Sequence, residues 1–174
     1  MSGIDPSLDD TDVEILRLLQ ENARMSNAEI ARSVGMAPSA ILERIRKLES
    51  RGTLRSYEPR IEGRALGLAL LAFIFVRGED DLRTGTVGQA LARIPEVLEV
   101  HHVAGEDCYL VKVRVADTDA LGRLLRESLG SIPHVRSTRT TIVLATVKET
   151  GCLPLGATAS KTETRVGAEA SSND

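Results

Sequence analysis

The first sixty residues carry apolar side chains at the spacing of amphipathic helices, in three short runs. Asp9 stands where it can cap the first helix, and Ser26 with Glu29 three positions later forms a capping box for the second. The second run stops at Gly35, a residue type that commonly ends helices. The apolar positions of these two helices are Ile15, Leu16, Leu18, Leu19, Ile30, Ala31 and Val34.

The third run begins after a short turn. Pro38 suits the first turn of a helix and Gly52 the position just past its end, so the pattern predicts a helix through ILERIRKLES. A small residue in the second helix (Ala31), a glycine turn and buried aliphatics in the third helix are what a helix-turn-helix requires. The next segment, LRSYEPRIE, is predicted as a short linker strand broken by Pro59, which would give the unit a winged form.

The pattern changes in the second half of the chain, where strands and helices are predicted in the order βαββαβ. The strands are LGLALLAFIFV, VLEVHHVAG, CYLVKVRVA and VRSTRTTIVLATV, and the helices are GTVGQALARI and DTDALGRLLRESLGSI. The sequences IPEV at 94–97 and IPHV at 132–135 each follow a helix and open a strand, so the strand–helix–strand unit occurs twice. Two such units form a four-stranded antiparallel sheet with both helices on one face, a ferredoxin-like α+β arrangement.

The first of these strands is apolar on both faces, around Leu70, Phe73 and Phe75. A two-layer sheet normally leaves one face to water, so the outer face of this strand needs a cover. A second copy of the chain is the simplest cover, and we therefore expect a homodimer at least.

Composition restricts the class of protein. No apolar run is as long as a bilayer span, and the acidic start MSGIDPSLDD is not a secretory signal. Cys108 and Cys152 show neither metal-type spacing nor a disulfide framework, while His101 and His102 are adjacent on a strand and so face opposite ways. Phosphate-binding loops and nucleophile–base motifs are absent from the sequence. We expect a cytoplasmic protein without metal, cofactor, membrane partner or enzymatic activity.

The net charge of −3 does not by itself suggest that the protein binds nucleic acid, but the charges are distributed unevenly along the chain. Residues 1–23 hold one basic and six acidic side chains, whereas residues 24–60 hold eight basic and four acidic ones. A local basic balance is what contact with a polyanion requires. A solvated helix with scattered arginines accounts for the charge pattern equally well.

The third helix supplies the candidate DNA-binding face. Ile41, Ile45 and Leu48 point inward on a helical wheel, and the opposite face would enter the major groove of double-stranded DNA. There the cationic side chains reach guanine edges or phosphates, and Arg55 just after the helix is a candidate phosphate contact. The predicted DNA-binding residues are Ser39, Ala40, Glu43, Arg44 on the flank, Arg46, Lys47 and Arg55. A plain three-helix bundle is the alternative.

These segments, in this order, make the chain resemble the leucine-responsive/asparagine-regulator (Lrp/AsnC) family of transcription factors from Leu8 to about Glu149. The resemblance rests on LDDTDVEILRLLQENARMSNAEIARSVGMAPSAILERIRKLESRG, HHVAGEDCYLVKVRV and STRTTIVL. It implies dimers formed through the C-terminal sheets, assembly into tetramers or octamers, a pseudo-palindromic operator, and a small effector, commonly an amino acid, bound between dimers. Residues 1–62 are then the DNA-binding domain with its linker strand, 63–150 the effector-binding and oligomerisation domain, and 151–174 a disordered tail.

The resemblance also implies an effector pocket, made by the turn between the second and third strands and by threonines of the last strand. The corresponding residues are Gly105, Glu106, Asp107, Cys108, Tyr109, Thr138, Thr140 and Thr141. Without the resemblance, a plain hairpin turn and strand-favouring threonines explain them. Two positions depart from the family: Cys108 replaces an aspartate, and Ala37 replaces the serine before Pro38, a weaker cap by about 1 kcal/mol.

Two other functions fit a similar architecture. Siroheme decarboxylases resemble it, but they carry a His-Asn-Tyr-x-Arg type stretch where this chain has VHHVAGEDCYL. An architectural DNA organiser with little sequence preference is the second alternative, and even coverage of DNA in footprints would favour it over a specific regulator.

Overall fold

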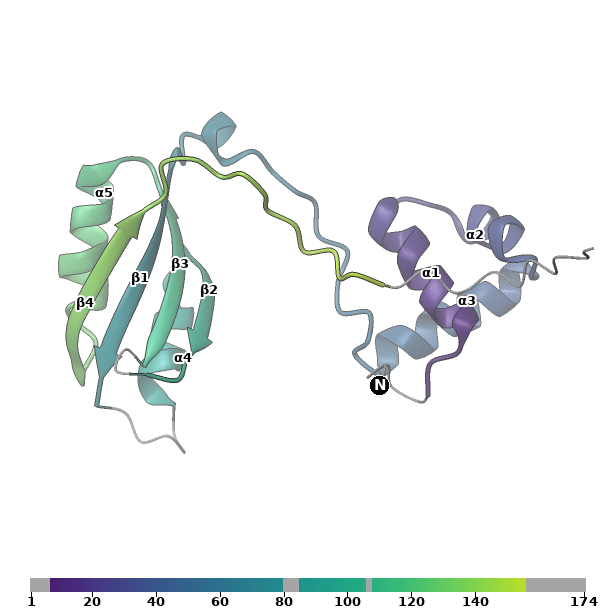
Figure 1. Cartoon of the computed structure of the whole chain (residues 1–174), viewed down its shortest axis with the longest axis horizontal. Coiled ribbons are helices and arrows are strands. Elements are labelled where there is room, and N and C mark those ends of the chain that lie inside the picture. Colours follow the sequence, from purple (N-terminus) through teal and green to yellow (C-terminus); the bar gives the residue numbers. More distant parts are fainter. Residues whose placement is uncertain (1–6, 80–84, 106–107, 156–174) are drawn as a thin grey trace, which may run out of the picture. The chain divides into compact units, whose positions relative to one another are not determined.

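The computed structural model describes residues 7–79, 85–105 and 108–155, which fall into two compact units, each with its own hydrophobic core (Figure 1). The first unit contains residues 7–58 together with 150–155, and the second is Pro59–Glu149. Of the tail predicted to be disordered, residues 151–155 belong to the first unit, and the remainder lies outside the described residues.

Three helices make up most of the first unit: α1 (Asp10–Glu21), α2 (Asn27–Val34) and α3 (Pro38–Ser50). The predicted caps are confirmed, because the Asp9 side chain accepts from the Asp12 amide and Ser26 with Glu29 forms a reciprocal capping box. Gly35 ends α2 with φ of +75°, a conformation that disfavours any side chain. The three helices enclose an aliphatic core of Ile15, Leu18, Leu19, Ile30, Ala31, Ile41, Ile45 and Leu48.

The segment after α3 differs from the prediction. Residues 55–62 form no strand, so the linker strand and the winged form expected from the sequence are not present in the described part of the chain. A strand requires a partner for its backbone groups, and no segment among the described residues pairs with 55–62.

Residues 150–155 contact the first unit at the end of α1. The Gln20 side chain donates to the Leu153 carbonyl at 3.2 Å and accepts from the Leu153 amide at 2.6 Å. The Cys152 thiol lies 3.7 Å from the Gln20 carbonyl oxygen. The helical unit is therefore built from both an early and a late part of the sequence.

The second unit confirms the predicted βαββαβ order. Its elements are β1 (Leu70–Gly78), α4 (Thr86–Ala92), β2 (Val97–His102), β3 (Tyr109–Val115), α5 (Thr118–Arg123) with a π-helical continuation (Leu124–Leu129), and β4 (Val135–Ile142). The strands form one antiparallel sheet in the order β2-β3-β1-β4, the ferredoxin-like topology. A short 3-10 turn (Gly63–Leu66) precedes β1.

All four strands are shorter than the predicted segments. The first begins at Leu70 rather than Leu66, because Gly67 turns the chain with φ of +75°. The last ends at Ile142, which pairs with Ala72 of β1, and one more bond, from the Val143 amide to the Leu71 carbonyl, follows this pair.

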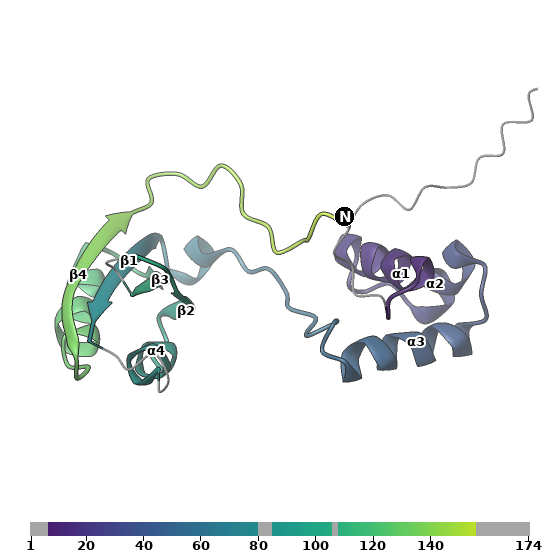
Figure 2. The ribbon, with the colours of Figure 1, turned by 60° about the horizontal axis from the view of Figure 1, so that its bottom comes forward.

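The helices cover only one face of the sheet (Figure 2). Strand β3 alternates strictly between buried and half-buried residues, and its buried members pack with those of β1 beneath α4 and α5. The opposite face, which we call the open face, carries Leu71, Phe73, Phe75 and Leu110. The prediction that β1 is apolar on both sides is thus confirmed, and its second side is not covered by either helix.

Candidate DNA-binding surface and effector site

The outward side of α3 carries the predicted DNA-binding residues. Ile41, Ile45 and Leu48 are buried, which leaves Ser39, Glu43, Arg46 and Lys47 exposed and Ala40 half-buried. Among the described residues, no hydrogen bond or ion pair engages the side chains of Arg46 and Lys47. Two cations on an exposed helix face are available to phosphates and guanine edges.

Arg44 differs from its neighbours on α3. Its Nη1 donates to Asp9 Oδ2 at 2.8 Å and to Asp12 Oδ1 at 2.7 Å, and its side chain is 29 % exposed. One guanidinium nitrogen is therefore bonded to the start of α1, which sets Arg44 apart from Arg46 and Lys47, and its contact with DNA stays a prediction. The sequence could not reveal this pairing, since the partners lie 35 and 32 positions away.

Arg55 follows α3 on the exposed linker. The Tyr57 hydroxyl donates to Glu49 Oε1 at 3.2 Å and holds this linker against the end of α3. Burial of the ring and the neighbouring Glu49 charge raise the pKa of Tyr57, so the hydroxyl keeps its proton and remains a donor. Arg55 is thus kept close to α3, as a phosphate contact beside that helix would require.

The turn between β2 and β3, together with Tyr109 at the start of β3, contains five of the predicted effector residues. Gly105 has φ of +134°, a value suited to glycine, while Glu106 and Asp107 lie outside the described residues. Cys108 donates its thiol hydrogen to the Gly78 carbonyl at 3.2 Å, which ties the turn to the end of β1.

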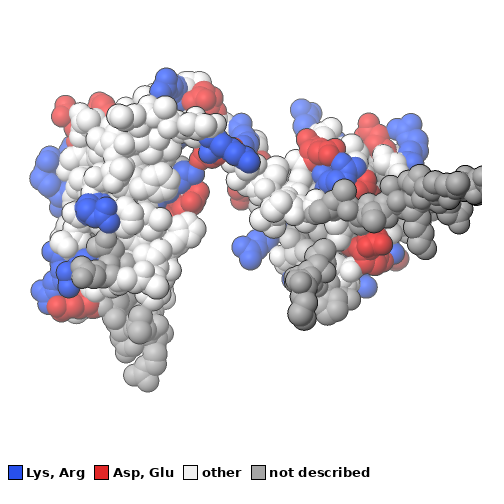
Figure 3. All heavy atoms as spheres, viewed as in Figure 1, with Lys and Arg blue, Asp and Glu red and all other residues white. Residues whose placement is uncertain are grey.

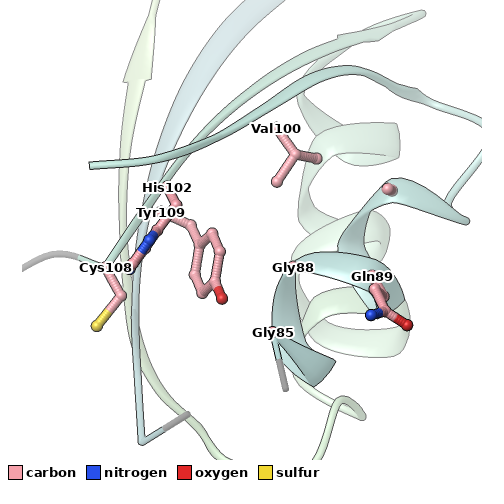
Figure 4. A pocket seen from close by; sticks show the side chains of 8 residues that line it. Gly85, Gly88, Gln89, Val100, His102, Cys108 and Tyr109 are labelled. Atoms are coloured by element: carbon pink, nitrogen blue, oxygen red, sulfur yellow. The ribbon is translucent and has the colours of Figure 1, made fainter. Parts of the chain in front are cut away.

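Beside this turn, an open cavity of about 430 Å³ lies between α4 and the strands β2 and β3 (Figure 4). The Tyr109 ring projects toward α4 and lies 5.1 Å from the His102 ring. A Cβ atom on Gly88 would come within 2.8 Å of that ring, so only glycine fits there. The lining residues are Gly85, Gly88, Gln89, Ala92, Val100, His102, Cys108 and Tyr109.

Sequence reasoning missed the contribution of α4 to this cavity. The helix meets the turn only because the crossover from β1 to β2 lays it over the sheet, and no local pattern reports that. The one signal of this contact in the sequence is Gly88. Glycine is unfavourable inside a helix, so its presence there indicates that another group approaches the helix closely.

The threonines of β4 do not reach the turn within one chain. Thr138 and Tyr109 both pair with Val76, one from each side, so two strand spacings of about 4.8 Å each separate them. Thr140 pairs with Ile74 and shares the helix-covered face with Thr138. Thr141 pairs with Phe73 and lies on the open face instead.

The open face combines apolar side chains with a charged margin. The Arg139 guanidinium stacks 3.9 Å from the centre of the Phe75 ring. Lys112 bonds Glu99 at 3.0 Å and also pairs with Glu149. The bond from Lys112, together with one from His101, outweighs partial burial and lowers the pKa of Glu99. Figure 3 shows most of the surface over the sheet free of Lys, Arg, Asp and Glu.

Neither a metal centre nor a membrane-spanning helix is present among the described residues. In residues 7–79, 85–105 and 108–155, no three His, Cys, Asp or Glu side chains are grouped so as to hold a metal ion. No helix in those ranges has the length and apolar character needed to cross a bilayer.

Comparison with known proteins gives two family-model matches. Residues 8–49 match the AsnC-type helix-turn-helix domain and residues 71–153 the Lrp/AsnC ligand binding domain. The HTH-type transcriptional regulator FL11 of Pyrococcus horikoshii is 38 % identical over 148 residues, which cover 85 % of this chain and 97 % of that protein. The leucine-responsive regulatory protein of Escherichia coli K12 is 37 % identical over 149 residues, 84 % of this chain and 90 % of the relative.

Solved structures agree. A transcriptional regulator of Neisseria meningitidis in complex with L-Met matches with a TM-score of 0.78 and 33 % identity, over 86 % of this chain and 97 % of the other. The leucine response regulatory protein LrpA of Mycobacterium tuberculosis matches with a TM-score of 0.74 and 37 % identity, over 82 % and 96 %.

Proposed function

The chain belongs to the Lrp/AsnC family of transcriptional regulators, and on that premise we propose that it binds specific operators through the exposed face of α3 under control of an amino-acid effector. The observation that carries this proposal is the pair Arg46 and Lys47, exposed on α3 while its aliphatic residues are buried. Ser39, Ala40, Glu43 and Arg55 complete the surface. Through its sheet the chain assembles at least into a dimer, which suits a pseudo-palindromic operator.

Arg46→Ala and Lys47→Ala are each expected to weaken DNA binding without unfolding the protein. Loss of a base contact should cost roughly 1–3 kcal/mol of binding free energy and relax the base preference at one position of the operator. Loss of a phosphate contact should instead weaken binding to all DNA sequences and reduce the salt dependence of binding. Binding is measured by fluorescence anisotropy on a duplex selected by the wild-type protein from a random library. Arg123→Ala, an exposed cation on α5, is the charge-matched control. Unchanged affinity in both α3 variants would place the recognition surface elsewhere.

The effector is proposed to bind at the β2–β3 turn and the adjoining cavity. Gln89, His102 and Tyr109 offer polar groups there, and Val100 and Ala92 an apolar wall for a side chain. A free amino acid needs amide donors for its carboxylate and an acid for its ammonium group, which Gly105, Glu106 and Asp107 can provide. The hydroxyls of Thr138 and Thr140 would come from a second chain, because they lie across the sheet in the same one.

Asp107→Ala is expected to abolish the effect of the amino acid on operator affinity while leaving effector-free DNA binding nearly intact. A thermal-shift screen of the amino acids first identifies the effector, since a ligand of the folded state raises apparent stability. Titrating DNA with and without it then gives the coupling free energy. Asp119→Ala, an exposed acid on α5, is the control. Undiminished coupling in Asp107→Ala would mean that Cys108 and Tyr109 matter more, or that the pocket lies elsewhere.

A low-specificity DNA organiser is the second candidate within the same family. The exposed cations of α3 would serve either role, so the two differ in the pattern of occupancy along DNA. Protection at a few discrete promoters supports the specific regulator, and even coverage supports the organiser.

A further inference from the structure

Arg44 joins the recognition helix α3 to the start of α1 through two carboxylates. It bonds Asp9 at 2.8 Å and Asp12 at 2.7 Å, and Asp12 is the buried charged residue of the described chain, with 8 % exposure. A guanidinium shared by two carboxylates has fixed directions, unlike the aliphatic contacts of Ile41 and Ile45, which are not directional.

The same two carboxylates form the cap of α1. Asp9 accepts from the Asp12 amide at 2.8 Å, and the Asp12 carboxylate accepts from the Asp9 amide at 3.4 Å. Arg44 therefore binds to a rigid helix end rather than to a mobile side chain. Partial burial opposes ionisation of Asp9, but the bonds from the Asp12 amide and Arg44 prevail and lower the pKa of Asp9, so Asp9 stays charged at neutral pH.

A second arginine, Arg51 at the C-terminal cap of α3, binds the same segment. Arg51 follows Arg44 by seven residues, which is about two helical turns, and donates to the Ser7 carbonyl at 3.3 Å and the Ser7 hydroxyl at 3.2 Å. The segment from Ser7 to Asp12 thus contacts α3 at two points about two helical turns apart, at Arg44 and at the Arg51 cap. Figure 2 shows α1 and α3 as neighbouring helices of this unit.

We propose that Arg44 is a positioning residue for DNA recognition: by binding Asp9 and Asp12 it sets the rotation of α3 about its axis, and so the direction in which Arg46 and Lys47 face the groove. This role rests on the proposed function. A bidentate base contact depends on direction, so a small rotation of α3 would weaken such contacts without removing any DNA-facing side chain. In this role Arg44 acts through the placement of α3, with its Nη1 bonded to Asp9 and Asp12, and not through a contact of its own with the duplex.

The test compares Arg44→Gln, Asp12→Asn and the double variant on a duplex selected by the wild-type protein from a random library. Each single change is expected to lower affinity about tenfold, and the double variant should bind no worse than the weaker single one, since all remove the same link. The slope of log K against log salt should stay at the wild-type value, because no phosphate contact is lost.

Other outcomes would overturn the role. If Asp12→Asn binds as tightly as wild type while Arg44→Gln lowers the salt slope by about one, Arg44 contacts a phosphate. Should Arg44→Gln fail to fold by circular dichroism, Asp9→Asn removes one arm of the link and keeps a good helix cap. Unchanged affinity in both Asp9→Asn and Asp12→Asn would then refute positioning. A wild-type protein that selects no duplex would overturn the proposed function as well.

Discussion

Phe73→Lys should convert the assembled protein into monomers. Phe73 lies on the open face, directly opposite Lys112 of β3 and Thr141 of β4. A lysine there would face Lys112 across the strands and would have to be buried in the proposed interface, where an unpaired charge costs several kcal/mol. The dissociation constant of the dimer is expected to rise at least about a thousandfold.

Sedimentation velocity at micromolar concentration measures this change. The wild type should show no substantial monomer, and Phe73→Leu, which keeps the face apolar, should behave like it. Circular dichroism confirms that the lysine variant keeps its fold, because the helix-covered core of Ala72 and Ile74 is not altered. If Phe73→Lys sediments like wild type, the subunits associate through another surface.

Gly88→Ala is the second large effect that we expect, and it concerns stability. Alanine normally stabilises a helix by about 1 kcal/mol relative to glycine. At this position the new Cβ would lie 2.8 Å from Cε1 of Tyr109, a ring held in the core with 6 % exposure. Overpacking of that kind costs about 1–3 kcal/mol, so the free energy of unfolding should fall despite the better helix former.

Urea unfolding of four variants isolates the contact. Gly122→Ala in α5 is the matched control, since its Cβ would meet only the flexible end of Arg126 at 3.2 Å, and it should be neutral or gain up to about 1 kcal/mol. Tyr109→Leu removes the ring, and in that background Gly88→Ala should no longer destabilise. If Gly88→Ala still lowers the free energy of unfolding in the Tyr109→Leu background, Gly88 is required for a reason other than the Tyr109 ring.

Local signals predicted local structure well. The caps at Asp9 and Ser26 and the turn at Gly35 depend on residues within three or four positions, and the structure confirms each of them. The repeated IPEV and IPHV segments correctly marked the openings of β2 and β4, at Val97 and Val135. From these, the ferredoxin-like order followed.

Contacts between distant segments were not predictable in the same way. Arg44 was predicted on the flank of the third helix, but its carboxylate partners could not be, because they lie at the start of α1. The predicted linker strand is not formed, because an extended backbone without a hydrogen-bonding partner is not a β-strand. The faces of Thr138, Thr140 and Thr141 could have been read from strand alternation, which places the last of them opposite to the other two.

The contact between Gln20 and Leu153 has a consequence for synthesis. A ribosome releases α1 early, whereas residues 150–155 emerge only after the entire sheet unit has been made. The three helices can pack on their own beforehand, because their aliphatic core lies within the first 48 residues. During translation the Gln20 side chain is therefore left to water until the final stretch of chain arrives. A polypeptide terminated before residue 150 would keep the recognition helix but leave this end of α1 permanently unpaired.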